Sequence, residues 1–140
     1  MIILDTNVVT EVMKASPAAA VVSWLNARDS SALYLTAITL GEIHYGLRTM
    51  PQGLRRQRLE EGFERVIAAA FTGRILAFGE EAAAHYGEVM ARRKELGRPL
   101  SAPDGQIAAI ARLHGFAVAT RNVRDFLACG IEIVNPFEPT

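Results

Sequence analysis

Ile2-Ile3-Leu4-Asp5-Thr6-Asn7 is a short apolar run that meets three polar residues at once. A wholly apolar run of this length is typical of a strand buried on both faces of a parallel sheet. The polar residues that follow predict a loop at the carboxyl end of that strand. Because ligands bind at this edge of an open α/β sheet, Asp5 is the first candidate functional residue.

Further apolar runs alternate with stretches of helical periodicity along the rest of the chain. The predicted strands are residues 33–36, 74–78, 116–120 and 131–134. The predicted helices begin at Pro17 and then cover residues 38–47, 55–71, 80–96 and 101–114, with one helical turn at 124–127. This alternation predicts an α/β fold, with a short parallel sheet flanked by helices on both faces.

The composition is that of one globular domain. The chain has 140 residues, of which 50% are hydrophobic and 21% are charged, enough to fill one core. Fifteen basic side chains balance fifteen acidic ones, which excludes a disordered polyelectrolyte and a protein that binds nucleic acid through bulk charge. Local basic clusters occur at 55–58 and 92–94, where a solvated helix face is the favoured interpretation, and at Arg121 with Arg124.

Several classes of protein and site are excluded by missing motifs. A single cysteine, Cys129, allows neither an intramolecular disulfide nor a thiolate zinc site. The first residues lack the basic and apolar regions of a signal peptide, and no apolar run approaches the roughly 20 residues that span a bilayer. No glycine-rich nucleotide loop and no paired-histidine metal motif is present. We therefore expect a soluble, cytoplasmic protein with no membrane partner.

Three acids fall at positions that suit a metal site. Asp5 follows the first predicted strand, and Asp104 opens the helix that precedes the fourth. Glu42 shares a helix face with Ile38 and Tyr45, a face that we expect to be apolar, so the Glu42 carboxylate needs a cation there. An oxygen-only cluster of this kind suits Mg²⁺ or Mn²⁺. Close carboxylates without a cation should also have raised pKa values.

Each of these residues also has a purely structural interpretation. Asp5 could cap the segment that follows it as an Asx turn. Asp104 could be the acid of a capping box at the start of its helix. Asn122 and Asp125 could cap the short helical turn after the fourth strand, and Glu42 could simply be solvated. Placement of so many polar side chains near one sheet edge favours a functional site over independent caps.

Six segments in order carry a resemblance to a known family. They are residues 3–8 (ILDTNV), 36–43 (TAITLGEI), 73–76 (GRIL), 102–109 (APDGQIAA), 118–122 (VATRN) and 134–137 (VNPF). With these motifs the chain resembles the PIN-domain ribonucleases of the VapC toxin type, and their order is most similar to the FitB-like branch. The resemblance covers essentially the whole chain. It implies a single PIN domain over residues 1–140 with a PIN-like three-layer fold.

The resemblance implies a metal-dependent endoribonuclease that uses Mg²⁺, with Mn²⁺ as a substitute. Asp5, Glu42 and Asp104 match the three principal acids of the family. In that match Asp5 and Asp104 hold the metal ion, and Glu42 holds a metal-bound water or acts as a base. The fourth acid of the FitB-like pattern is replaced by Asn122, and Asp125 lies three residues further on.

The resemblance also implies substrate contacts and partners. Thr6 and Thr120 match hydroxyls beside the family's pocket, and Arg121 at the same edge is predicted to contact an RNA phosphate. A small antitoxin, a homodimer and promoter DNA bound by the toxin–antitoxin complex are implied, with residues 38–71 as the expected dimer and antitoxin surface. The alternative is a non-catalytic binding subunit. Asn122 favours that alternative, but three acids kept without a cation argue against it.

Overall fold

The computed structural model describes residues 1–139 and contains a sheet of five parallel strands in the order β3-β2-β1-β4-β5. The strands are β1 (Ile2–Leu4), β2 (Leu33–Thr36), β3 (Ile75–Leu76), β4 (Ala117–Ala119) and β5 (Ile133–Val134). The predicted short parallel sheet is confirmed. The two edge strands, β3 and β5, are shorter than the apolar runs that predict them, since each has a partner on one side only.

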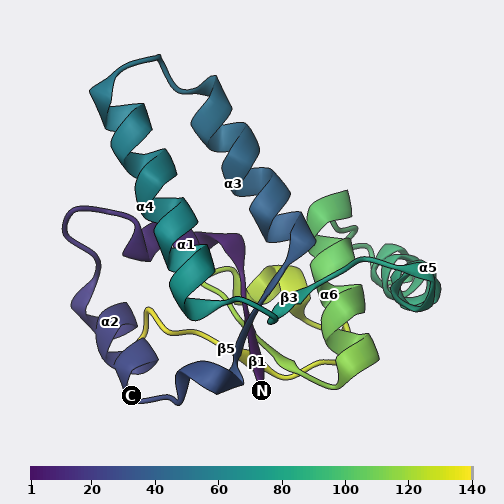
Figure 1. Cartoon of the computed structure of the whole chain (residues 1–140). Coiled ribbons are helices and arrows are strands. Elements are labelled where there is room, and N and C mark those ends of the chain that lie inside the picture. The colour runs from purple at the N-terminus through teal and green to yellow at the C-terminus, as the bar shows by residue number, and fades with distance from the viewer. Residues whose placement is uncertain (140) are drawn as a thin grey trace.

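The first strand lies at the centre of the sheet (Figure 1). Ile2 pairs with Leu33 of β2 on one side and with Ala117 of β4 on the other. At the end of β1, the backbone N–H of Asp5 donates to the carbonyl of Ala119 at 2.9 Å. This register brings the carboxyl ends of β1 and β4 together.

Six α-helices surround the sheet. They are α1 (Thr6–Val12), α2 (Ala19–Asn26), α3 (Ala37–Thr49), α4 (Leu54–Ala70), α5 (Glu80–Glu95) and α6 (Ala102–His114), with 3₁₀ turns η1 (Ser30–Ala32) and η2 (Val123–Phe126). The prediction of a polar loop after β1 is wrong. Asp5 caps α1 by accepting a hydrogen bond from the Thr6 N–H at 2.8 Å, so the polar residues enter a helix. None of these helices is long and apolar enough to span a bilayer.

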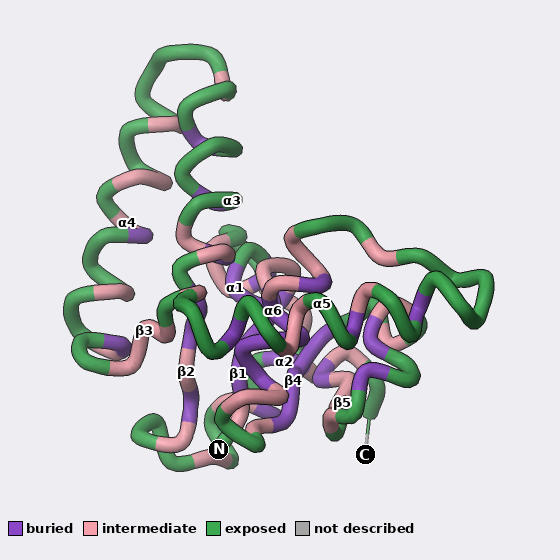
Figure 2. The backbone as a smooth tube through the Cα atoms, turned by 90° about the vertical axis from the view of Figure 1, so that its right-hand side faces the viewer, coloured by how far each residue is buried: buried purple, intermediate pink, exposed green. Residues whose placement is uncertain are grey.

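The core has one half on each face of the sheet. Leu4 and Ala119 pack with α1, α2, α3 and α4, whereas Ile3 and Val118 pack with α5 and α6. Successive strand residues point to opposite faces, so each central strand contributes to both halves. Figure 2 shows buried chain running through β1 and β4. The three-layer arrangement expected from the resemblance is confirmed.

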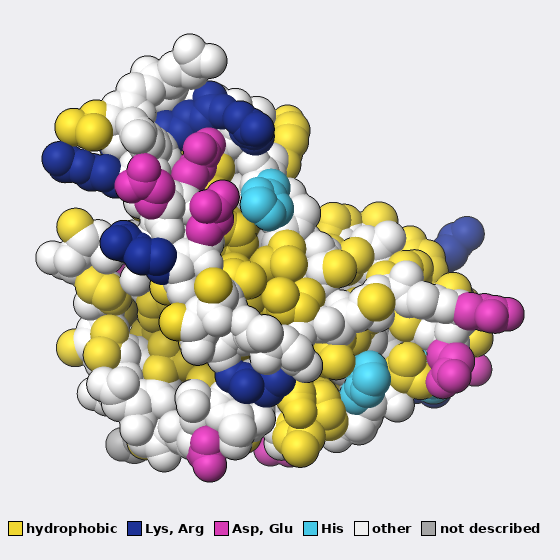
Figure 3. All heavy atoms as spheres, in the orientation of Figure 1, with side chains coloured by type: hydrophobic (Ala, Val, Ile, Leu, Met, Phe, Trp, Pro, Cys, Tyr) yellow, Lys and Arg dark blue, Asp and Glu magenta, His cyan; other side chains and the backbone are white. Residues whose placement is uncertain are grey.

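Helices α3 and α4 form a hairpin that projects beyond the sheet (Figure 1). Ile43 and Leu47 of α3 and Phe63 of α4 are buried, and the ring of Phe63 meets His44 edge-on with centroids 5.4 Å apart. The outer surface of the hairpin carries charged side chains above a broad hydrophobic stretch (Figure 3). Val66 is exposed, although it lies on α4 only three residues after the buried Phe63. Sequence periodicity identifies a face of a helix but not whether a neighbour covers that face.

Helices α5 and α6 approach each other closely at Gly105. A Cβ at this position would lie 2.4 Å from the Met90 Sδ and 3.1 Å from the Tyr86 ring. Only glycine allows this approach without movement of α5. Because Gly105 follows Asp104, the same close packing fixes the first turn of α6, which carries that acid.

Candidate functional site: an acidic edge of the sheet

Asp5 is the most buried acid at the carboxyl edge, with 4% of its surface exposed. Its carboxylate accepts hydrogen bonds from the hydroxyl of Thr120 at 2.7 Å and from the amide of Asn7 at 3.2 Å, besides the Thr6 N–H. Burial nevertheless outweighs these bonds and raises the pKa of Asp5 to about 6, with smaller contributions from the charges of Asp104 and Glu42. The Asx-cap interpretation is confirmed, but a cap alone does not require burial.

Thr120 and Asn7 join the ends of β1 and β4. The Thr120 hydroxyl oxygen accepts from the backbone N–H of Asn122 at 3.0 Å while it donates to Asp5. The Asn7 side-chain oxygen accepts from the backbone N–H of Arg121 at 3.1 Å. Sequence reasoning missed Asn7, although a polar side chain two residues after a strand-end acid is the available signal. These bonds fix the orientation of the Asp5 carboxylate.

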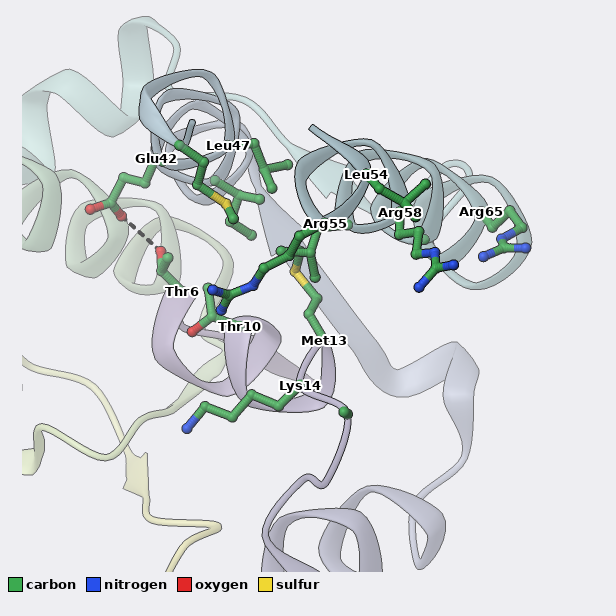
Figure 4. A pocket seen from close by; sticks show the side chains of 16 residues that line it. Thr6, Thr10, Met13, Lys14, Glu42, Leu47, Leu54, Arg55, Arg58 and Arg65 are labelled. Atoms are coloured by element: carbon green, nitrogen blue, oxygen red, sulfur yellow. Dashed lines mark hydrogen bonds between the residues drawn. The ribbon is translucent and has the colours of Figure 1, made fainter. Parts of the chain in front are cut away.

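Glu42 lies on an exposed face of α3, so the expected apolar face is wrong. Tyr45 on the same face is 73% exposed, because no element packs against this side of the projecting hairpin. The Glu42 carboxylate nevertheless turns toward α1, where it accepts a hydrogen bond from the Thr6 hydroxyl at 2.7 Å (Figure 4). The hydroxyls of Thr6 and Thr39 are 3.0 Å apart. Glu42 is therefore solvated and yet oriented toward the edge.

Asp104 is half-buried in the first turn of α6. Its backbone N–H donates to the Ser101 hydroxyl at 3.4 Å, so Ser101 caps the helix as the structural interpretation expects. Burial is the main cause that raises the pKa of Asp104, and the charges of Asp125 and Glu42 raise it further. The predicted rise in pKa is thus confirmed for Asp5 and Asp104. Their mutual influence places the acids at one edge.

Asn122 and Asp125 take different positions around η2. Asn122 is exposed and its side chain makes no capping hydrogen bond, so its expected cap is wrong. Asp125 is half-buried, and its carboxylate raises the pKa of Asp104. The charge in this turn that raises the pKa of Asp104 is therefore that of Asp125.

Arg121 lies beside the carboxyl edge, and its guanidinium contacts the side chains of Glu11 and Phe137. Its side chain is 52% exposed, its guanidinium donates to Glu11 Oε1 at 3.3 Å, and it lies 3.9 Å from the centre of the Phe137 ring. Glu11, missed by sequence reasoning, is buried and also accepts from Lys14 Nζ and the Ala18 N–H, each at 2.9 Å. These hydrogen bonds, with that of Lys14 first, lower the pKa of Glu11.

The chemistry of the acidic edge fits a hard divalent cation. All candidate donors are oxygens, and no Lys or Arg between residues 1 and 139 forms an ion pair with Asp5, Glu42 or Asp104. A buried carboxylate with a pKa raised to about 6 and no cationic partner is what a metal ion stabilises. Over the same residues, no three acid, histidine or cysteine side chains stand close enough to form a complete ligand set. A metal ion bound at this edge would therefore need water ligands as well, which Mg²⁺ usually retains.

A groove of about 1140 Å³ runs from this edge between α1, α3 and α4 (Figure 4). Thr6 and Glu42 lie at one end of the groove. Its apolar lining includes Met13, Ile43, Leu47, Met50, Leu54 and Leu59, and its basic lining is Lys14, Arg55, Arg58 and Arg65. The cluster at 55–58 is thus divided, because Arg56 pairs with Glu60 at 2.8 Å instead of lining the groove.

A parallel sheet with Asp5, Glu42 and Asp104 at its carboxyl edge defines an α/β protein with an acidic site at its strand ends. A model of the PIN domain matches residues 2–129. The chain is 45% identical to VapC ribonuclease Y4jK of Sinorhizobium fredii over 99% of both chains, and 39% identical to toxin FitB of Neisseria gonorrhoeae over 98% and 99%. It matches a chain in the structure of FitAB bound to an IR36 DNA fragment with a TM-score of 0.94 and 38% identity, over 100% and 98%. The chain therefore belongs to the PIN-domain family, in the group of the VapC ribonucleases and FitB toxins.

Proposed function

We propose that the protein is a metal-dependent endoribonuclease toxin that uses Mg²⁺, for which Mn²⁺ can substitute. The observation that carries this proposal is the buried Asp5 carboxylate, whose pKa of about 6 is raised by burial and further by Asp104 and Glu42. Retention of such a group without a cation is costly. The 45% identity to a protein named as a ribonuclease supports the same activity.

In this proposal each side chain has a separate task. Asp5 and Asp104 hold the ion, which when bound neutralises phosphate charge and lowers the pKa of a coordinated water. Thr120 and Asn7 orient the Asp5 carboxylate. Glu42 is exposed and already oriented by Thr6, so it is placed to accept a proton from an attacking water. The products then carry 5′-phosphate and 3′-hydroxyl ends.

Arg121 is proposed to contact a phosphate of the RNA next to the scissile bond. Its guanidinium is half exposed at the carboxyl edge, and Glu11 and Phe137 restrict its position. A guanidinium held in place loses less side-chain entropy when it binds a phosphate than a free one does. Thr6 lies at one end of the groove, where its hydroxyl donates to Glu42.

The test is cleavage of a mixed RNA pool by the partner-free protein with Mg²⁺, with EDTA, and by the Asp5→Asn variant. We expect cleavage only by the wild type with Mg²⁺, and mass spectrometry should find 5′-phosphate ends. The matched control is Glu64→Gln, an exposed acid on α4, which should cleave normally. Cyclic phosphate ends would contradict the water-attack chemistry. No cleavage by folded wild type would favour the alternative, a non-catalytic binding subunit, to which the neutral Asn122 points.

We further propose that the groove binds a small antitoxin. Its apolar lining and basic side chains suit an amphipathic segment with acidic residues, and an occupant that reaches Thr6 and Glu42 would cover the acidic edge. The similar FitAB structure contains DNA, which supports a complex in which the partner binds promoter DNA. Leu54 lines the groove and is 61% exposed, so Leu54→Glu should weaken antitoxin binding. Val22→Glu, on α2, exposed and outside the groove, is the control.

A homodimer is the proposed state of the protein without its antitoxin. The hairpin of α3 and α4 leaves exposed hydrophobic side chains at Tyr45 and Val66 that a second copy can cover. Light scattering at micromolar concentration should give twice the mass of one chain. A mass of about 15.2 kDa would contradict the dimer without affecting the proposed activity.

A further inference from the structure

Arg93 is buried, although the basic cluster at residues 92–94 is expected to form a solvated helix face. Arg92 and Lys94, its neighbours on α5, are exposed, whereas Arg93 is 4% exposed. The expectation for the cluster at 92–94 is therefore wrong for its central residue. An arginine is rarely buried to this extent unless its donors are satisfied.

The guanidinium of Arg93 is satisfied by backbone carbonyls. Its Nε donates to the carbonyl of Arg98 at 2.7 Å, and its Nη1 donates to the carbonyls of Arg124 at 3.1 Å and Leu127 at 2.6 Å. Within residues 1–139 no carboxylate forms an ion pair with it. A buried cation held by three carbonyls, with the Cys129 thiol beside it, stabilises the backbone conformation that presents those oxygens.

The three carbonyls come from the two segments that carry acids of the edge. Arg98 belongs to the connection between α5 and α6, a few residues before Asp104. Arg124 and Leu127 lie on either side of Asp125 in and after η2. Arg93 therefore joins the segment that leads to Asp104 to the segment that holds Asp125.

We propose that Arg93 is a positioning residue of the acidic edge, which sets the separation of the Asp104 and Asp125 carboxylates. This rests on the proposed function, in which these carboxylates surround a divalent cation. The planar guanidinium reaches three carbonyls in fixed directions. A lysine has one nitrogen on a flexible stem and does not reproduce that geometry. Charge alone is therefore insufficient, and Arg93→Lys is the informative variant.

The first experiment measures Mn²⁺ binding to the whole protein by electron paramagnetic resonance. We expect Arg93→Lys to raise the Kd for Mn²⁺ about tenfold, the effect typical of residues that orient ligands, while the protein still unfolds cooperatively. Arg92→Lys, one residue away and exposed, is the matched control and should stay within about twofold. An unchanged Kd in folded Arg93→Lys would overturn the proposal.

A double-variant comparison tests the route through Asp125. Asp125→Asn alone should also weaken Mn²⁺ binding. If Arg93 acts by placing Asp125, then adding Arg93→Lys to Asp125→Asn changes the Kd much less than Arg93→Lys does in the wild type. If Arg93→Lys raises the Kd for Mn²⁺ by the same factor in Asp125→Asn as in the wild type, this route is overturned.

A metal-free measurement separates failure of this inference from failure of the proposed function. Hydrogen exchange in EDTA should show faster exchange over residues 122–127 in Arg93→Lys than in Arg92→Lys, with β1 and β4 unchanged. Wild type that binds no Mn²⁺ would contradict the proposed function but not this result. Equal protection of residues 122–127 in both variants would overturn the positioning role of Arg93.

Discussion

The hydroxyl of Thr120 donates a 2.7 Å hydrogen bond to the carboxylate of Asp5, although 115 residues separate the two in the sequence. The bond is fully buried and joins the carboxyl ends of the two central strands, β1 and β4. The same hydroxyl oxygen accepts from the Asn122 N–H. The Thr120 side chain thus fixes both the Asp5 carboxylate and the start of the segment that leads to Asp125.

Thr120→Val should raise the pKa of Asp5 and destabilise the protein. The hydroxyl bond is the largest of the contributions that lower this pKa, and its loss also leaves the Asn122 N–H without its acceptor. We expect a loss of about 1–3 kcal/mol in the free energy of unfolding, with the acid limb of the pH–rate profile moved to higher pH. Denaturant unfolding and cleavage kinetics measure the two effects. Thr120→Ser keeps the hydroxyl and should retain most of both properties.

The metal-free protein should become less stable as the pH rises from about 4 to about 6. The ordinary pKa of an aspartate is 3.8, and burial raises that of Asp5 to about 6 in the folded protein, so in this range the folded state binds the proton and the unfolded state releases it. Asp5→Asn should therefore be more stable than wild type at pH 7 in EDTA, by at most ~3 kcal/mol. Thermal unfolding with EDTA measures this. A more stable wild type at pH 7 would contradict the assignment, whereas excess Mg²⁺ should reverse the order.

Arg121→Ala should weaken RNA binding more than Arg56→Ala. Arg121 is half exposed at the acidic edge, whereas Arg56 is paired with Glu60 away from the groove. Loss of one phosphate contact should lower the slope of log Kd against log salt by about one. Titration of catalytically inactive protein with labelled RNA at several salt concentrations measures this. Equal slopes for the two variants would remove Arg121 from the substrate contacts.

Asp125→Asn should weaken Mn²⁺ binding more than Asn122→Ala. Asp125 acts on the pKa of Asp104, while the side chain of Asn122 is exposed and makes no capping bond. We expect about a tenfold rise in the Kd for Mn²⁺ in Asp125→Asn, because it removes a charge close to the site. We expect at most about a twofold rise in Asn122→Ala, because that side chain is neutral. Calorimetric titration with Mn²⁺ decides between them. The reverse order would make Asn122 the functional replacement for the fourth acid.

The sheet and its edge were predictable because apolar runs report burial directly. Ile3 and Leu4 of β1 and residues 117–119 of β4 are buried, so the sequence already places Asp5 and Thr120 at strand ends. The family resemblance then selects Glu42 and Asp104. The exposure of Glu42 was not predictable, because it depends on the hairpin of α3 and α4 standing clear of the body.

The positions of Arg93 and Glu11 were also beyond the sequence. Each is a charged residue on a helix, where exposure is the usual outcome. What buries them is the meeting of distant groups, namely the carbonyls of Arg98, Arg124 and Leu127 around Arg93, and the Ala18 N–H and Arg121 around Glu11. The local sequence pattern does not predict these contacts, because they form only when distant segments pack together.

The central position of β1 also has a consequence for how the chain is synthesised. Asp5 is translated before its strand partner β4 and its hydrogen-bond donor Thr120, which lies 115 residues later in the sequence. Pairing between such distant segments forms late in folding. A chain cut short by an early stop thus contains Asp5, Glu42 and even Asp104 without the strand that assembles them. Strand order thus keeps the acidic edge from assembling until β4 has been translated.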